Sequence, residues 1–185
     1  MNKPLAAAAA AAFALSLTGA SAFAALAVGS HAPQFTASGY LDGKPITFDL
    51  KAALKKGPVV LYFFPAPHTD GCNMEAHMFA ESIDKFHALG ATVIGVTANN
   101  LNQLATFSSE TEYCSGKFPV AADPGAKIAK QYDAKAIIPI PVSNRVSFVI
   151  TPQGKIIFAR DTMVPRTHIQ ETLAVLTDWR AKHPG

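Results

Sequence analysis

The feature that most constrains the fold is a short apolar run followed at once by a proline-containing loop. The run spans residues 59–64 and reads Val-Val-Leu-Tyr-Phe-Phe. Because it is apolar at every position and rich in β-branched and aromatic side chains, it predicts a strand buried on both faces of a sheet. Pro65 ends the strand, since a prolyl nitrogen cannot donate to a neighbouring strand. The loop that follows leads directly to Cys72.

A helix is predicted behind this loop, over residues 73–89. Apolar side chains recur there at three- and four-residue spacing, as expected of the buried stripe of a helix: Met78, Phe79, Ile83, Phe86 and Leu89. Cys72 therefore lies where the chain enters the first turn. Backbone N–H groups at that end lack partners and carry partial positive charge, which favours the nucleophilic thiolate. Cys72 is the candidate reactive centre.

The same reasoning divides the rest of the chain into alternating strands and helices. Strands are predicted at residues 35–40 (an edge strand), 45–50, 91–97, 118–122, 146–150 and 156–160. Further helices are predicted at residues 50–54, 101–113, 126–132 and 166–181. The succession of strand, helix and strand around Cys72 predicts a right-handed parallel crossover. Parallel strands followed by an antiparallel hairpin predict one mixed-sheet α/β domain of thioredoxin type.

Local signals set several of these boundaries. Asp49 and Asp123 are predicted to cap the helices that follow them, and Thr167 with Gln170 is predicted to form a capping box. Thr111 is predicted to face inward from the helix 101–113. All six histidines are predicted to face solvent, because no two of them have ligand spacing: His31, His68, His77, His87, His168 and His183. No metal site is expected.

Two separated motifs resemble a known family. Pro65, Thr69 and Cys72 form the pattern Pro-x-x-x-Thr-x-x-Cys, and residues 144–156 form a strand-turn-strand that contains Arg145. Together they resemble the active-site motifs of the peroxiredoxins of the AhpC/TSA superfamily, most closely the bacterioferritin comigratory protein branch. The resemblance extends from about Val28 to Trp179. It implies a thioredoxin-like domain over residues 28–185, with a mixed central sheet flanked by helices, that acts as a thiol-dependent peroxidase.

The resemblance also implies a role for each motif residue. Cys72 would attack hydrogen peroxide or a small organic hydroperoxide and become a sulfenic acid. Thr69 would bond the thiolate and the peroxide, although a loop-to-helix cap is the alternative. Arg145 would stabilise the thiolate and donate to a peroxide oxygen, and Pro65 would shield the sulfur from water. No cofactor is implied.

The sulfenic acid must then be resolved by a second thiol. His77 occupies the position where part of the branch has a second cysteine, which leaves Cys114 as the only internal candidate. The alternative is that Cys114 is a free or buried thiol and that an external thiol acts: a thioredoxin-like protein, a glutaredoxin-like protein or a low-molecular-weight thiol. Glu75 stands where a Cys-x-x-Cys motif would need cysteine. The rival class is a non-catalytic redoxin-fold protein that binds a partner or senses redox state.

The first 24 residues resemble an export signal. Lys3 precedes an alanine-rich apolar stretch, and Ala22-Phe23-Ala24 is a small-x-small cleavage site. Residues 20–22 and 25–27 are alternative cleavage sites. A cleaved signal peptide predicts a periplasmic or secreted protein without stable membrane association, whereas an uncleaved membrane anchor is the alternative. In an oxidising compartment two cysteines often form a structural disulfide, but a domain of this size does not need one.

Charge excludes one class of partner. The formal net charge is +3, and removal of Lys3 leaves about +2. This charge is too small and too dispersed for nucleic-acid binding. The expected partners are a hydroperoxide and a thiol reductant, and the protein is expected to be a monomer or a homodimer.

Overall fold

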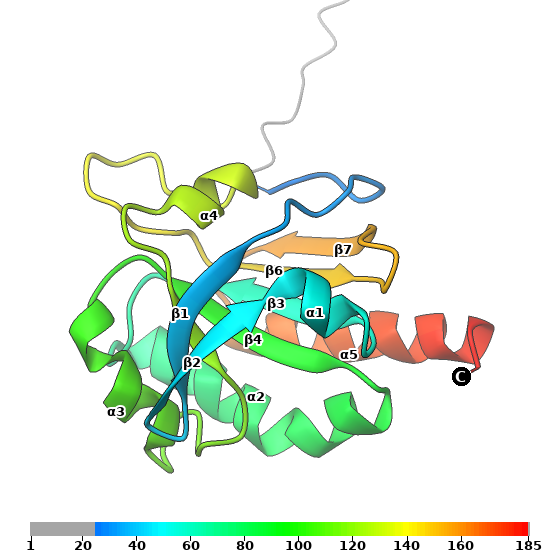
Figure 1. Cartoon of the computed structure of the whole chain (residues 1–185), viewed down its shortest axis with the longest axis horizontal. Helices are drawn as coiled ribbons and strands as arrows, with labels where there is room; N and C mark the ends of the chain where they lie inside the picture. Colours follow the sequence, from blue (N-terminus) through cyan, green and yellow to red (C-terminus); the bar gives the residue numbers. More distant parts are fainter. Residues whose placement is uncertain (1–24, 185) are drawn as a thin grey trace, which may run out of the picture.

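A seven-stranded mixed β-sheet with helices on both faces forms the body of the molecule (Figure 1). The computed structural model describes residues 25–184, so the predicted signal peptide lies outside the described residues. The strands are β1 (Thr36–Leu41), β2 (Lys44–Asp49), β3 (Val59–Phe63), β4 (Thr92–Thr97), β5 (Val120–Ala122), β6 (Val146–Ile150) and β7 (Ile156–Asp161). Their order across the sheet is β2-β1-β5-β4-β3-β6-β7. The predicted mixed α/β fold is confirmed.

Strand β3 lies inside the sheet, as its sequence predicts. It pairs in parallel with β4 and antiparallel with β6, and all five of its residues are buried. Alternate side chains enter different layers: Leu61 and Phe63 join one apolar cluster, whereas Tyr62 joins the other. A strand that is buried on both faces needs apolar residues at every position, which accounts for the unbroken run.

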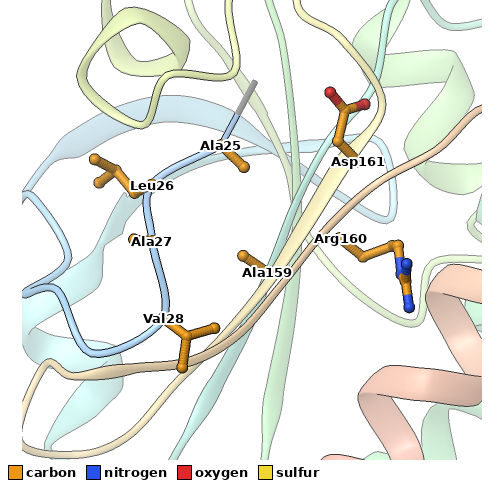
Figure 2. A pocket seen from close by; sticks show the side chains of 7 residues that line it. All are labelled: Ala25, Leu26, Ala27, Val28, Ala159, Arg160 and Asp161. Carbon is orange, nitrogen blue, oxygen red and sulfur yellow. The ribbon is translucent and has the colours of Figure 1, made fainter. Parts of the chain in front are cut away.

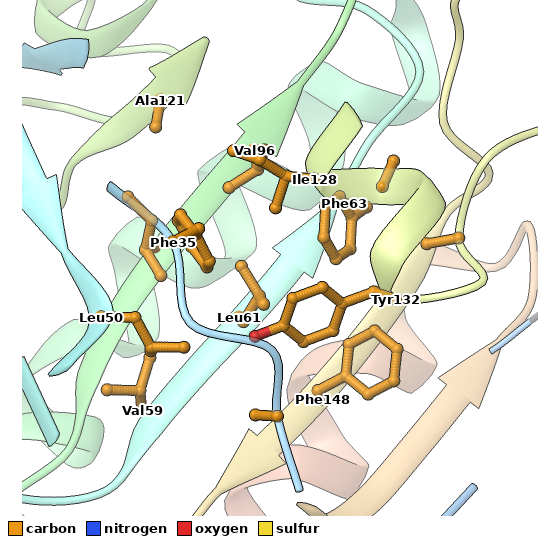
Figure 3. Close-up of a cluster of buried hydrophobic side chains, with 14 of the residues drawn as sticks. Phe35, Leu50, Val59, Leu61, Phe63, Val96, Ala121, Ile128, Tyr132 and Phe148 are labelled. Carbon is orange, nitrogen blue, oxygen red and sulfur yellow. The ribbon is translucent and has the colours of Figure 1, made fainter. Parts of the chain in front are cut away.

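Helices cover the two faces unequally. They are α1 (Leu50–Leu54), α2 (Asp70–Ala88), the 3₁₀ turn η1 (Leu101–Gln103), α3 (Leu104–Ser109), α4 (Lys127–Gln131) and α5 (Pro165–Lys182). The short helices α1 and α4 cover the face on which Phe63 packs against Tyr132 and Phe148 (Figure 3). The long helices α2 and α5, together with α3, cover the opposite face. None of these helices combines the length and the apolar character needed to cross a membrane.

Strand β1 is an interior strand, so the prediction of an edge strand is wrong. It pairs with β2 on one side and with β5 on the other, which leaves β2 and β7 as the edges of the described sheet. Gly39 makes the second pairing possible, because a Cβ there would lie 2.2 Å from the carbonyl oxygen of Val120. A glycine inside a strand often marks such a close approach.

The predicted caps have mixed outcomes. Asp49 accepts a hydrogen bond from the backbone N–H of Ala52 at the start of α1. Asp123 likewise accepts from two backbone N–H groups of α4, at 2.9 and 2.8 Å. The prediction of a capping box at the start of the last helix is wrong. Helix α5 starts with Pro165, so Thr167 already lies within its first turn.

The helix predicted over residues 101–113 is shorter than expected. Helix α3 ends at Ser109, and residues 111–116 form consecutive turns in which Thr111 is exposed instead of inward. The hydroxyls of Ser108 and Ser109 donate to the carbonyl of Ala105 one turn back. Such bonds compete with regular helix continuation. Cys114 therefore lies in a turn segment and not at a helix end.

Candidate active site

Cys72 lies in the first turn of α2, as predicted, with 2% of its surface exposed. The helix begins at Asp70, three residues before the predicted start, and Thr69 is the residue that precedes it. Residues 64–69, here called the entry loop, connect the end of β3 directly to the start of α2. The buried strand therefore positions the thiol. A buried sulfur at a helix N-terminus has two of the features that favour a reactive thiolate, the unpaired N–H groups and the helix dipole.

Arg145 supplies a positive charge to this sulfur. It immediately precedes β6, whose first residue Val146 pairs with Phe63 at the end of β3. This register brings Arg145 beside the entry loop, and its Nη2 donates to Cys72 Sγ at 3.4 Å. Gly71 leaves room for the guanidinium, because a Cβ there would lie 2.9 Å from Nη2. The contact between Arg145 and Cys72 was expected from the family resemblance alone.

Glu75 completes this part of the site. It lies one turn after Cys72 and is fully buried, and the Nη1 of Arg145 donates to its Oε2. Burial raises the pKa of Glu75 to about 8, although the charge of Arg145 acts to lower it. From the sequence, Glu75 was considered only as the residue that excludes a Cys-x-x-Cys motif, so its place in the site was missed.

Two further polar residues extend the site away from Cys72. His168 on α5 and Ser147 on β6 are both fully buried, and His168 Nδ1 lies 2.8 Å from Ser147 Oγ. The prediction that His168 faces solvent is therefore wrong. The sequence contained a usable signal, because His168 precedes Ile169 on the inward face of the last helix, and Ser147 is the one polar residue in an otherwise apolar strand.

Pro65 and Thr69 lie in the entry loop beside this cluster. Pro65 is half-buried, and its carbonyl accepts a hydrogen bond from Thr97 at 3.2 Å. Thr69 is exposed, and its hydroxyl donates to the carbonyl of Ala66 at 2.9 Å instead of capping α2. Neither residue shows a side-chain hydrogen bond to Cys72 among the described contacts. Since the Thr69 oxygen keeps its lone pairs, it remains able to accept a hydrogen bond.

His68 ties the entry loop to the segment after α3. Its ring nitrogens lie 2.9 Å from Gln103 Oε1 and 2.7 Å from Glu110 Oε2. Burial lowers the pKa of His68, but the hydrogen bonds to Glu110 and Gln103 and the charge of Glu110 outweigh it, so the pKa is raised overall. With 28% of its side chain exposed, His68 is half-buried and not solvent-facing as predicted. The other histidines are exposed as predicted: His31, His77, His87 and His183.

Cys114 lies in the same apolar cluster as Cys72 but in a different electrostatic setting. It is fully buried in the turn segment after α3, and both cysteines are free thiols. Burial raises the pKa of Cys114, and the negative charge of Glu110 raises it further. Both effects favour the protonated thiol. In this conformation the fold therefore disfavours the nucleophilic thiolate of Cys114.

A separate cleft of about 360 Å³ lies beside strand β7 (Figure 2). It is lined by residues 25–28 and by residues 159–161, with Arg160 and Asp161 at one side. It contains neither cysteine and none of the polar residues around Cys72. Within the described residues, no group of three or more His, Cys, Asp or Glu side chains is arranged to hold a metal ion.

Comparison with known proteins identifies the family of the chain. Residues 28–159 match the model of the AhpC/TSA family. The chain belongs to this family. Relatives include the chloroplastic peroxiredoxin Q of Gentiana triflora, 31% identical over 84% of this chain and 69% of the relative, and that of Sedum lineare, 29% identical over 84% and 81%. The chain is therefore a thiol-dependent peroxidase, and it is similar to bacterioferritin comigratory protein and peroxiredoxin Q.

Two solved structures share the fold. Peroxidoxin BcpB from Mycobacterium tuberculosis superposes with a TM-score of 0.73 at 24% identity, over 82% of this chain and 96% of the relative. The reduced 2-Cys peroxiredoxin of Plasmodium vivax also gives 0.73 at 20% identity, over 85% and 99%. The expected thioredoxin-like fold is therefore confirmed.

Proposed function

We propose that Cys72 is the peroxidatic cysteine of this peroxidase and that Arg145 activates it. The observation that carries the proposal is the contact between Arg145 Nη2 and Cys72 Sγ in the first turn of α2. A cation beside a buried sulfur stabilises the thiolate, and a buried guanidinium is also a strong donor to an oxygen that gains negative charge. Cys114 has neither advantage, because its charged neighbour is Glu110.

The reaction begins when the Cys72 thiolate attacks one oxygen of the hydroperoxide. A sulfur–oxygen bond forms, the O–O bond breaks, and the second oxygen leaves as hydroxide or alkoxide and takes up a proton. The products are a sulfenic acid on Cys72 and water or an alcohol. Arg145 would stabilise the charge that develops on the leaving oxygen. Thr69 would accept a hydrogen bond from the hydroperoxide, because its own O–H group already donates to Ala66. Pro65 would shape the loop and limit access of water.

We further propose that Cys114 resolves the sulfenic acid. Two observations support this role: Cys114 shares an apolar cluster with Cys72, and it lies in turns that can open without loss of a helix on its side. Its thiol would attack the sulfenic sulfur and release water, which leaves a disulfide. An external thiol would then reduce the disulfide. If Cys114 does not act, the same external thiol would reduce the sulfenic acid directly.

Intact mass and free-thiol counts after one equivalent of hydrogen peroxide test both assignments. The reduced mature protein is compared with C72S and C114S. We expect rapid loss of two hydrogens in the wild type, gain of one oxygen in C114S and no rapid reaction in C72S. Gain of one oxygen in both the wild type and C114S would contradict the resolving role and establish a one-cysteine mechanism. Rapid oxidation of C72S would overturn the assignment of Cys72.

We infer a periplasmic or secreted location, supported by the composition of residues 1–24. The reductant is then an exported thiol protein or a small thiol, and the protein is a monomer or a homodimer. Mass spectrometry of the protein from fractionated cells tests the location. A cleaved N-terminus near Ala24 in the exported fraction is expected, whereas an intact Met1 in the cytoplasm would contradict the inference.

A further inference from the structure

The side chain of His68 connects the entry loop to the segment that contains Cys114. His68 lies four residues before Cys72, and its ring reaches Gln103 at the end of η1 and Glu110 just after α3. Cys114 follows Glu110 four residues later, in the turns after α3. These two bonds, here called the His68 tie, thus hold together the parts of the chain that carry the two thiols.

Both ring nitrogens of His68 face oxygen atoms that accept hydrogen bonds. Nδ1 lies 2.9 Å from Gln103 Oε1, and Nε2 lies 2.7 Å from Glu110 Oε2. A neutral imidazole has one N–H group and can donate to only one of these oxygens, whereas an imidazolium donates to both. The geometry therefore fits the charged ring, with the carboxylate of Glu110 as its counter-ion.

Packing and backbone conformation also show that the ring is held in place. The rings of Phe107 and Tyr113 meet it edge-on, with centroids 5.5 and 5.3 Å away. The backbone of His68 has a φ of 56°, in the left-handed region that side chains with a Cβ rarely adopt. Such a conformation persists only where surrounding contacts compensate for the strain. The contacts of the ring with α3 and the segment after it provide this compensation.

We propose that His68, as an imidazolium, is a positioning residue that holds the entry loop against residues 110–116 and thereby limits how fast Cys114 reaches Cys72. The proposal rests on the proposed function, in which Cys114 resolves the sulfenic acid. In that step a sulfur–sulfur bond forms, the sulfur–oxygen bond breaks, and the hydroxyl leaves as water with the proton of the Cys114 thiol. Both thiols are free and buried, so at least one segment must move before the sulfurs can bond.

The groups around His68 make the tie sensitive to pH. Burial opposes the charged ring, but the hydrogen bonds and the charge of Glu110 outweigh it, so the pKa of His68 lies above its usual value of 6.5. Tyr113 also contacts the ring, and Asp70 follows the entry loop at the start of α2. Because the pKa is raised by folding, the tie is complete below pH 6.5 and weakens as the pH rises through the raised value.

The test compares the rate of disulfide formation in H68A and in the wild type from about pH 6 to about pH 9, after one equivalent of hydrogen peroxide. Ionisation of the Cys114 thiol accelerates the step in both proteins, so the ratio of the two rates is the informative quantity. We expect H68A to be about two- to fivefold faster near pH 6, and the ratio to fall at least halfway towards one near pH 9. Loss of a positive charge alone would disfavour the Cys114 thiolate and slow the step, so acceleration reports the lost tie.

Two further comparisons separate the tie from a general effect of losing a histidine. H77A is the matched control, because His77 pairs with Glu81 on the exposed side of α2, and we expect its rate to equal that of the wild type at every pH. In an E110Q background, H68A is expected to change the rate by less than about 1.5-fold near pH 6. A ratio for H68A that does not vary with pH would overturn the proposal, since a neutral ring bonded to a Gln103 amide with its oxygen and nitrogen exchanged gives that result.

Amide hydrogen exchange of the reduced proteins gives a readout that needs no peroxide. Near pH 6 we expect exchange in residues 110–116 to be about threefold or more faster in H68A than in the wild type, and exchange in α5 to be unchanged. Equal exchange in residues 110–116 would overturn the proposal. A wild type that forms no disulfide would refute the resolving role of Cys114, whereas a disulfide that H68A does not accelerate would refute only the role of His68, so the two failures are distinguishable.

Discussion

Cys72 and Cys114 are both buried in one apolar cluster, yet the charged groups that act on them have opposite signs. Cys72 has 2% of its surface exposed, and Cys114 has none. The nearest charged partner of Cys72 is the guanidinium of Arg145, whereas Glu110 acts on Cys114 and, with burial, raises its pKa. Burial alone therefore does not decide which thiol reacts. Under the proposed assignment of Cys72, the charge that the fold brings to each sulfur decides which thiol reacts.

Removal of the positive charge of Arg145 should have the largest effect on the difference in reactivity between the two thiols. In R145M we expect the rate of Cys72 oxidation by hydrogen peroxide to fall about 100-fold or more, because a buried donor to the reacting atoms is lost. The rate is measured by stopped-flow fluorescence in a C114S background. R160M is the matched control, since Arg160 pairs with Glu171 at the surface. A change of less than threefold in R145M would show that the helix N-terminus alone activates Cys72.

The pH dependence of stability should reveal the buried histidine beside the Cys72 site. The pKa of His168 is lowered to about 4, so its stabilising contribution is present above pH 6.5 and lost as the pH falls from 6.5 towards 4. The expected loss is about 3 kcal/mol. It is isolated as the difference in unfolding free energy between wild type and H168Q, measured in urea at several pH values. A difference that does not vary over this range would contradict the assignment of a neutral, buried ring.

The titration of Glu75 changes the unfolding free energy in the opposite direction with pH. Its contribution must therefore be measured separately from that of His168. Because its pKa is raised to about 8, its contribution is present below pH 4.5 and is lost as the pH rises towards 8. In E75Q we therefore expect the unfolding free energy to decline less between pH 5 and pH 8 than in the wild type. An identical decline in both proteins would show that Glu75 does not titrate in this range.

Serine substitutions should distinguish the two sulfur sites by stability. In C114S a hydroxyl replaces a thiol in an apolar, fully buried position, and we expect a loss of about 1–3 kcal/mol. In C72S the new hydroxyl can accept a hydrogen bond from Arg145, so a smaller loss is expected. Urea denaturation of both variants under reducing conditions provides the comparison. An equal or greater loss in C72S would contradict the polar character assigned to its pocket.

His68 connects the entry loop before Cys72 to the segment near Cys114. Its substitution should have the smallest effect of the variants considered. Its ring joins the entry loop to Glu110 and Gln103, close to the segment of Cys114. In H68A that tie is lost, so we expect disulfide formation between Cys72 and Cys114 to accelerate about two- to fivefold. The rate is followed after the sulfenic acid has formed. H77A is the control, because the pair of His77 with Glu81 lies on the exposed side of α2. Slower disulfide formation in H68A would contradict the idea that His68 restrains the two segments.

Several elements followed directly from local patterns, and others did not. The run 59–64 predicted β3, and the residues flanking Gly154 predicted the hairpin of β6 and β7. The prediction for residues 101–113 was wrong, because side-chain bonds of Ser108 and Ser109 to the backbone end α3 early. Apolar periodicity reports which face of a segment is buried, but not where competing hydrogen bonds stop it.

The sequence by itself determined the position of Cys72 at a helix start behind a buried strand, since both depend on residues close together in the chain. The resemblance of the loop and of the Arg145 segment to known motifs identified the chemistry. Only the tertiary structure decided that Glu75 and His168 meet. They lie on α2 and α5, far apart in sequence, and their contact depends on how these two helices pack against each other. A sequence pattern shows that such residues face inward, but not which buried polar groups lie opposite them.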